Sequence, residues 1–302
     1  MDAPPARLPE NSGIAFVGDA LRGPFELTEA HAFRLLAAPN PHGKPNRDVI
    51  RPWVGVPDVL RIPRRQWVID FAPDLEERQA ALYRLPFACV RRRIGGSAQG
   101  RRRPWWIHGG PQPAMRIAIA RCSRFIVTPA AGPRRVFSWL PAETLPERRL
   151  IVFVRDDDWS FGVLHSNIHR VWALRQGTRP AAGTPRFRYS PAACFETFPF
   201  PWPPATPLGK LTRAQEEQRT AIAQAARALD AARHEWLGDR SDPRRTLTAL
   251  YNARPSWLQQ VHSDLDAAVA AAFGWPADLA DEEILTRLLA LNRERAGLPP
   301  GP

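Results

Sequence analysis

Cysteine is scarce in this chain of 302 residues, and long hydrophobic runs are absent. The three cysteines, Cys89, Cys122 and Cys194, are odd in number and far apart, which excludes a disulfide framework and the paired spacing of a zinc ribbon. No window approaches about 18 consecutive apolar residues, so no membrane span is predicted, and the opening MDAPPARLPE lacks the apolar segment of a secretory signal. We therefore expect a soluble protein of a reducing compartment, the bacterial cytoplasm, with no membrane partner.

Sequence motifs of common catalytic sites are missing as well. The chain contains no G-x-G-x-x-G and no G-x-x-x-x-G-K-[ST], so neither dinucleotide nor P-loop phosphate binding is predicted. It has no G-x-S-x-G, and no cysteine has an evident histidine partner. Neither lysine follows an acidic residue by two positions, because His42 and Leu208 stand there, which excludes a metal-dependent nuclease of that pattern. We expect that the chain alone is not catalytic.

Negative charge is also absent from one long stretch. The formal net charge is +12, and residues 1–204 contain 30 Lys and Arg against 17 Asp and Glu, whereas residues 205–302 contain 12 against 13. Between positions 78 and 142 there are 13 arginines and no acidic residue. A high-GC genome accounts for the preference for Arg over Lys but not for the loss of acids. A field of one sign indicates a polyanionic partner, and the planar guanidinium can hold a phosphate or a guanine edge with two bonds.

Composition changes across a proline-rich segment. FPFPWPPATP at 198–207 holds five prolines in ten residues, which is typical of a semi-rigid extended connector. Short β-rich runs precede it, and an Ala-, Leu- and Arg-rich pattern of helical period follows it. We predict an α+β protein with a mixed-sheet domain at 1–197, a connector at 198–207 and a small all-α domain at 208–302.

Five segments before the connector predict strands, because they are β-branched and aromatic and turn residues separate them: QWVIDF (66–71), RFIVT (124–128), RVFSWL (135–140), RLIVFVR (149–155) and WSFGVL (159–164). Asp156, Asp157 and Asp158 lie between the last two, which indicates a hairpin. Three successive carboxylates also allow a metal-site interpretation, but aspartate is a common turn residue, and we favour the turn.

Helix signals begin at Ser166, which can cap a helix that ends at Gly177. His165 and His169 are four residues apart, a spacing that can bind zinc, but no HExxH motif or cysteine accompanies them, so packing or phosphate contact is favoured. Beyond the connector, Thr212 and Gln215 fit a capping box before a helix that reaches Gly238. Two more helices are predicted from about Ser256 to Phe273 and from about Asp281 to Gly297.

Several segments in collinear order resemble the C-terminal part of MmeI-like restriction–modification proteins, adenine-methylating DNA enzymes sometimes grouped as type IIL. The resembling stretches are PNPHGKPNRDVIRPWV (39–54), WVIDFAPDLEERQAALYRLPF (67–87), WWIHGGPQPAMR (105–116), RFIVTP (124–129), VFVRDDDWSFGVLHSNIHRVWALRQGT (152–178), FETFPFPWPP (195–204) and the run from RTLTALYNARPSW onward (245–295). They extend over nearly the whole chain.

The resemblance implies a target-recognition domain followed by a C-terminal helical module, without the catalytic part. The methyltransferase signature, Asn/Asp-Pro-Pro followed by an aromatic residue, is absent, as is the glycine-containing S-adenosylmethionine loop. We therefore expect no cofactor in this chain; S-adenosylmethionine is implied for the missing catalytic domain. The chain is then either a recognition subunit that works with a separate catalytic chain or a truncated reading frame that has lost its catalytic half.

Candidate contacts to duplex DNA follow from position along the chain. Arg101, Arg102 and Arg103 follow the GGSAQG stretch and suit phosphate contact; Arg91, Arg92 and Arg93 do the same or form a solvated helix end. Arg134 and Arg135 stand in a predicted tight loop beside Gly132-Pro133, from which they can contact a base or a phosphate, and Arg116 and Arg124 are further candidates. Trp105 and Trp106 can stack on DNA or join the core, and Asn46 and Arg47 can contact base edges or form a turn.

The sequence leaves two other functions open. One is a generic nucleic-acid-binding or scaffold protein without a methyltransferase partner, which would bind all duplexes equally. The other is a self-sufficient methyltransferase, which would have to bind S-adenosylmethionine. The target sequence, an associated nuclease and the oligomeric state cannot be predicted from these residues.

Overall fold

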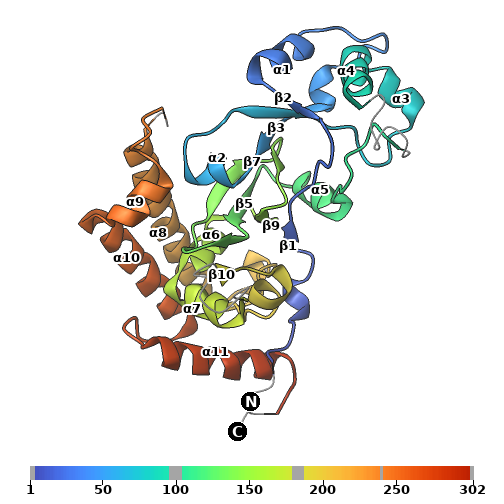
Figure 1. Ribbon diagram of the computed structural model, residues 1–302. Helices are drawn as coiled ribbons and strands as arrows, with labels where there is room; N and C mark the ends of the chain where they lie inside the picture. Colours follow the sequence, from blue (N-terminus) through green and yellow to red (C-terminus); the bar gives the residue numbers. More distant parts are fainter. Residues whose placement is uncertain (1–3, 95–103, 179–186, 239–240, 300–302) are drawn as a thin grey trace.

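The computed structural model describes residues 4–94, 104–178, 187–238 and 241–299. Two four-stranded sheets lie one above the other in Figure 1, and a group of long helices follows the lower sheet along the chain. The α+β fold class predicted from the sequence is confirmed. Within the described residues, no helix is long and apolar enough to cross a membrane.

The upper sheet has the strand order β2-β4-β3-β8. Its strands are β2 (Glu26–Leu27), β4 (Gln66–Ile69), β3 (Ile50–Val54) and β8 (Leu145–Pro146), and only the β3–β8 pair is parallel, so the sheet is mixed as predicted. Three helices pack around this sheet at the top of Figure 1: α1 (Glu29–Leu36), α3 (Glu77–Ala81) and α4 (Arg84–Ile94). Phe25, Phe71 and Val90 lie in the apolar core that these elements share.

The lower sheet is antiparallel, with the order β1-β9-β5-β7. It is formed by β1 (Ala15–Val17), β9 (Leu150–Phe153), β5 (Arg124–Pro129) and β7 (Ser138–Pro141). Side chains alternate along a strand, and here both faces are covered. Phe125 and Val127 pack with α2 (Val56–Leu60) and α5 (Pro113–Ile119), whereas Ile126 packs with the helices on the opposite face. A short ribbon of β6 (Ala131–Gly132) and β10 (Phe187–Arg188) flanks the sheet.

The segment WSFGVL is helical, so the predicted strand and hairpin are wrong. Helix α6 (Asp158–His165) begins where the hairpin was expected, and Asp157 caps it by accepting a hydrogen bond from the Ser160 amide at 2.9 Å. Every residue from Trp159 to Leu164 is buried. A segment that is apolar on all sides has no periodicity to distinguish helix from strand, so its aromatic and β-branched content predicted the wrong element. The aspartates favour a helix start electrostatically.

The four helices that the sequence predicted are present, whereas helices α1 to α5 were not among the predictions. Helix α7 (Asn167–Gln176) is capped by Ser166 and ends at Gly177, and α8 (Arg213–Leu237) has the predicted Thr212–Gln215 capping box. Helices α10 (Ser256–Phe273) and α11 (Asp281–Arg295) match their predicted ranges. Helix α9 (Leu247–Ala253) was not predicted. Short helical turns lie at Pro9–Asn11, Asn46–Asp48, Pro191–Phe195 and Leu208–Lys210.

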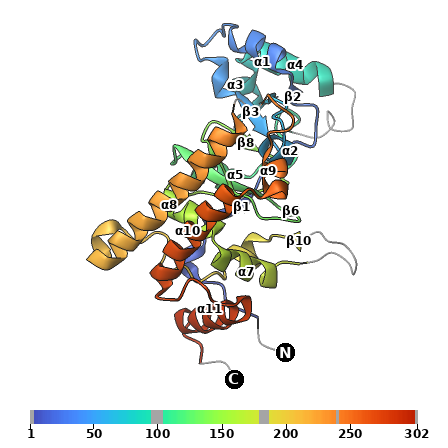
Figure 2. The ribbon, with the colours of Figure 1, turned by 90° about the vertical axis from the view of Figure 1, so that its left-hand side faces the viewer.

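One apolar core joins the lower sheet to the C-terminal helices. Helices α8 and α10 lie side by side in Figure 2, and α6 packs against both. In the proline-rich segment, Phe198, Phe200 and Trp202 are buried in the same core. Gly162 of α6 faces Ile222 of α8 so closely that a Cβ atom there would approach it to 2.7 Å. The division into 1–197, 198–207 and 208–302 stays a prediction, and the segment between the two predicted domains is tightly packed.

Candidate functional site

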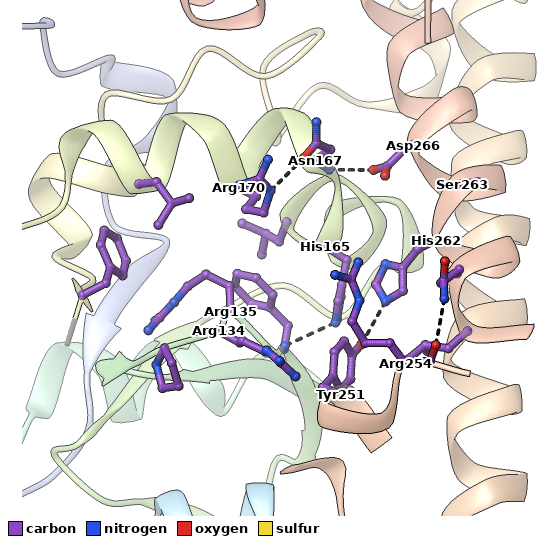
Figure 3. Close-up of a pocket in the computed structure, with 17 residues that line it drawn as sticks. Arg134, Arg135, His165, Asn167, Arg170, Tyr251, Arg254, His262, Ser263 and Asp266 are labelled. Atoms are coloured by element: carbon purple, nitrogen blue, oxygen red, sulfur yellow. Dashed lines mark hydrogen bonds between the residues drawn. The ribbon is translucent and has the colours of Figure 1, made fainter. Parts of the chain in front are cut away.

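A cavity of about 430 Å³ opens between the lower sheet and the C-terminal helices. Its walls come from the β6–β7 turn, the α6–α7 junction, the end of α9 and one face of α10, as Figure 3 shows. Pockets that bind small ligands have volumes of about 300–1,000 Å³, so the cavity has the size of a binding site. It is built from segments more than a hundred residues apart in the sequence.

The charge around this cavity is strongly positive. Among the residues that the structure describes, four arginines line it, Arg134, Arg135, Arg170 and Arg254, against a single carboxylate, Asp266. In Figure 3 they approach from different walls. Arg170 also pairs with Asp281 at 2.9 Å, whereas no ion pair involves the exposed Arg134 and Arg254 within the described part of the chain. Low-dielectric walls of one charge sign focus the field, so the cavity favours an anion.

Arg135 lies beneath this surface without a carboxylate partner. Its guanidinium donates to the carbonyl oxygen of Pro129 and lies 5.0 Å from the ring centroid of Phe187. Burial lowers its pKa to about 10. Among the described residues no acidic side chain forms an ion pair with it, so its charge is balanced only by backbone dipoles and aromatic faces.

Arg233 of α8 is a second buried cation beside the cavity. Its side chain is enclosed, and its Nη atoms donate to the carbonyl oxygen of Phe137 at 2.9 Å and to Nε2 of His165 at 3.0 Å. Nε2 of His165 also accepts the Phe137 amide at 3.2 Å. His165 is therefore the neutral tautomer that carries its proton on Nδ1, and burial and Arg233 hold its pKa well below the ordinary value. Like Arg135, Arg233 has no carboxylate partner within the described ranges.

The His165–His169 pair serves packing, one of the two roles favoured from the sequence. The ring nitrogens of His169 lie 2.9 Å from the Leu164 carbonyl oxygen and 3.0 Å from the Tyr189 hydroxyl. Burial lowers the pKa of His169 to about 4. Because protein groups occupy both rings, neither histidine is placed to hold a phosphate. The residues that the structure describes contain no group of three or more metal-ligating side chains.

The polar wall of the cavity lies on α10. Asp266 accepts the Asn167 amide at 2.6 Å at the start of α7, and burial raises the pKa of Asp266 to about 6. Burial, with the charges of Arg233 and Arg254, lowers the pKa of His262 to about 4. Nε2 of His262 lies 3.1 Å from the Tyr251 hydroxyl. The histidine is therefore neutral at pH 7 and adds no charge.

The structure separates the predicted DNA contacts into different environments. Arg134 and Arg135 reach the cavity, but Arg135 is mostly buried. Arg116 is enclosed between Asp19 and Asp70, which occupy its guanidinium. Arg124 pairs with Asp158 at 2.6 Å and lies 3.8 Å from the ring centroid of Trp139. The expectation of a DNA contact from Arg116 is therefore wrong, because its donors face buried carboxylates, and Arg124 is held by its own partners.

The remaining arginine predictions fall on or near α4. Arg91 and Arg92 are exposed there, as both interpretations of this triplet require. Arg93 differs from them, since it donates to the Glu26 carbonyl oxygen at 2.6 Å and so anchors the helix to β2. Arg101, Arg102 and Arg103 lie outside the described residues.

Two of the four other candidates prove to be structural. Trp106 is buried and donates from Nε1 to the Leu75 carbonyl oxygen at 2.9 Å, so it belongs to the core. Trp105 is half-buried, with its ring 5.0 Å from that of Phe87. Asn46 is fully buried, and its amide donates to the carbonyl oxygens of Leu35 and Ala38, which corrects the base-reading interpretation in favour of the turn. Arg47 is exposed.

Several cavity residues escaped the sequence analysis: Arg170, Tyr251, Arg254, Gln259, His262 and Asp266. A signal for part of this set was present. Gln259, His262 and Asp266 stand at i, i+3 and i+7 of the predicted 256–273 helix, so helical period places three polar side chains on one face. The distinguishing feature of Arg254 appears only in the structure, where its backbone, immediately before Pro255, is left-handed with φ 47°.

Comparison with known proteins finds a family model that matches a segment around the cavity. Residues 131–202 match the model of the family described as MmeI, target recognition domain. This segment contains the β6–β7 turn, α6, α7 and β10, which form much of the cavity. The chain is also 29% identical over 176 residues to a Bacillus subtilis (strain 168) protein named DNA methyltransferase A; that match covers 56% of this chain and 18% of the relative.

A solved structure has the same fold over nearly the whole chain. It is that of the type IIL restriction–modification enzyme MmeI in complex with DNA, with a TM-score of 0.70 and 18% identity. The match covers 99% of this chain and 38% of that enzyme, so the chain spans well under half the length of either relative. The resemblance to MmeI-like proteins that the sequence indicated is confirmed: residues 131–202 match the family model of the MmeI target recognition domain, and the fold of the chain is similar to that of the MmeI structure.

Proposed function

We propose that this chain recognises a specific sequence in duplex DNA on behalf of a restriction–modification methyltransferase. The observation that carries the proposal is that the target-recognition match at 131–202 coincides with the cation-lined cavity. Arginine excess supports it, since residues 1–204 hold the whole positive surplus of the chain. In this function, arginines on exposed turns and helix ends contact phosphates and set the register, while a few side chains contact base edges.

The finer parts of the proposal concern the methyl-transfer reaction, for which this sequence contains no motif. We propose that the methyl group goes to N6 of adenine and that a separate or lost catalytic domain, which binds S-adenosylmethionine, transfers it. That reaction requires the adenine to leave the base stack and enter the catalytic pocket. This chain then holds the distorted duplex, in the cytoplasm, without a cofactor of its own.

Selection from randomised duplexes tests the central claim. The purified chain is mixed with a duplex library at several salt concentrations, and the bound fraction is sequenced. A recognition domain enriches one short motif, and specific complexes of this kind are typically about 10³–10⁷ tighter than non-specific ones. Equal recovery of all sequences would identify a generic nucleic-acid binder instead and contradict the proposal.

Calorimetry with S-adenosylmethionine tests the proposal that a separate or lost domain, and not this chain, binds the cofactor. We expect no heat of binding to this chain and full binding to a complex that includes the catalytic domain. Saturable binding of the cofactor to this chain alone would contradict the proposal that a separate or lost domain binds it.

A further inference from the structure

Two buried arginines without counter-charge stand next to the cavity. Arg135 lines it, and Arg233 lies behind it, joined to the wall through His165 and Phe137. Neither forms an ion pair within the described ranges. An unpaired buried cation is costly, and a bound anion removes part of that cost. An anion in the cavity would therefore have two fixed guanidinium groups nearby before any surface arginine is counted.

The rim adds two cations that are free to move onto a ligand. Arg134 and Arg254 are exposed and approach from opposite walls, one on the β6–β7 turn and one at the end of α9. Asp266 is the opposing charge, and its carboxylate is already engaged by the Asn167 amide. A guanidinium holds phosphate through two parallel hydrogen bonds, so this rim suits a phosphate group.

The rest of the lining is neither uniformly polar nor charged. Phe137, Leu164, Leu174, Phe187 and Leu258 give an apolar floor. Gln259 and Ser263 of α10 and Asn167 of α7 add neutral donors and acceptors. Such a surface accommodates a flat heteroaromatic ring whose edges form hydrogen bonds, and the volume of about 430 Å³ leaves room for a sugar as well.

We propose that this cavity binds one nucleotide, with its phosphate between Arg134 and Arg254 and its base on the apolar floor beside α10. The nucleotide is either a unit of a bound DNA strand displaced from its stack or a free mononucleotide. Only the first source rests on the proposed function, so the two are tested separately.

The first experiment uses free ligands on the whole chain. Titration calorimetry compares deoxyadenosine monophosphate, deoxyadenosine and inorganic phosphate. The monophosphates of the other three deoxynucleosides are titrated as further nucleotides. We expect saturable binding of nucleotides, weaker binding of phosphate and of nucleoside, and a loss of at least about 10-fold for Arg254→Ala, since a hydrogen bond to a charged group accounts for that much. Equal affinity for inorganic phosphate and for the nucleotide would overturn the base-binding half of the proposal.

A plug variant tests the cavity without removing charge. Ser263 is exposed at the rim, so Ser263→Trp fills the opening without disturbing the core. Gln260→Trp, at an exposed position of the same helix away from the cavity, is the matched control. We expect Ser263→Trp to abolish nucleotide binding and Gln260→Trp to leave it unchanged. Equal binding by both variants, or no nucleotide binding by the unmodified chain or its DNA complex, would overturn the proposal.

Duplex binding then identifies the source. If the nucleotide belongs to DNA, Ser263→Trp weakens the specific complex about 10-fold or more, and 2-aminopurine at one position of the duplex becomes brighter with the unmodified chain but not with the variant. If the nucleotide is free, both variants bind the duplex alike while only Ser263→Trp loses mononucleotide. Sequence-specific duplex binding with no effect of the plug on either ligand would leave the proposed function standing and remove this inference.

Discussion

The two regions where arginine is buried treat its charge in opposite ways. In the upper region, Arg116 of α5 lies between Asp19 and Asp70, and His108 stands beside it with its pKa lowered by burial. The carboxylates raise the pKa of Arg116 although burial alone lowers it. In the lower region, the described groups that bond to or stack on Arg135 and Arg233 are carbonyl oxygens, aromatic rings, the Ser138 hydroxyl and a neutral histidine, with no carboxylate among them.

The difference shows which buried arginines have their charge compensated by carboxylates and which do not. The Arg116 cluster joins the end of β1, the end of β4 and helix α5, so it ties the two sheets together. In the lower region, Arg135 lines a cavity and Arg233 lies behind its wall. Arginine count alone therefore does not locate a binding surface; the placement of carboxylates does.

The largest expected effect on stability is at the Arg116 cluster, where Asp19 and Asp70 compensate the charge of the arginine. Arg116→Met leaves two buried carboxylates without their shared cation, and breaking a buried pair in this way costs about 3–5 kcal/mol of the free energy of unfolding. Urea denaturation followed by tryptophan fluorescence measures it. Arg84→Met on α4 is the control and should stay within about 0.5 kcal/mol. An equally mild Arg116→Met would break the comparison.

Next comes Asp266, the one carboxylate among the described residues that line the lower cavity. Its folded pKa of about 6 lies above the ordinary 3.8, so the folded state binds the proton more tightly and stability rises as pH falls from about 6 to 4. Asp266→Asn keeps an acceptor for the Asn167 amide and removes that dependence, with a gain of about 2 kcal/mol at pH 7. Denaturation curves at pH 4.5 and pH 7 check it; parallel pH profiles in both proteins would contradict it.

A smaller loss is expected at Arg135. Arg135→Met takes away the donor to the Pro129 carbonyl oxygen, which costs about 1–2 kcal/mol, but it leaves no carboxylate unpaired. The same urea experiment should therefore place it well below Arg116→Met. A loss as large as that of Arg116→Met would show that Arg135 is as structural as the upper cluster.

The smallest effects belong to the exposed arginines of α4. Arg91→Ala and Arg92→Ala should leave stability unchanged, and a variant that no longer neutralises one phosphate should show a salt slope of log K for duplex binding that is smaller by about 0.9. Fluorescence anisotropy at several salt concentrations measures the slope. An unchanged slope would show that these arginines are a solvated helix end, the alternative that the sequence left open.

The ends of α7 and α8 could be predicted from local caps, whereas α1 and α9 were missed although Thr28 and Thr246 cap them. Ser166 and Gly177 bound α7, and Thr212 and Gly238 bound α8, because local hydrogen bonds and backbone conformation fix those ends. WSFGVL failed because its environment is apolar on every side, so its periodicity carried no information. Helix α9 was missed because seven residues after a turn are too short to show a pattern.

Only part of the candidate site could be predicted from the sequence. Arg134 and Arg135 stood out beside Gly132-Pro133, since a tight loop in an acid-free stretch is well suited to phosphate contact. Their cavity partners Arg254, His262 and Asp266 lie more than a hundred residues away, in a region of balanced charge that the sequence predicted as a small all-α domain. No local pattern reports which distant helix will cover a loop.

The sequence by itself determined the class of the protein: a positive surplus confined to the first two thirds, a chain without catalytic motifs, and a set of collinear segments that resemble the MmeI family. Net charge, the absence of a motif and the order of segments are properties of the linear sequence, and folding does not change them. Only the tertiary structure decided which guanidinium groups meet carboxylates and which meet an open cavity. Coulombic compensation depends on distances of a few ångströms between residues far apart in sequence, and packing alone sets those distances.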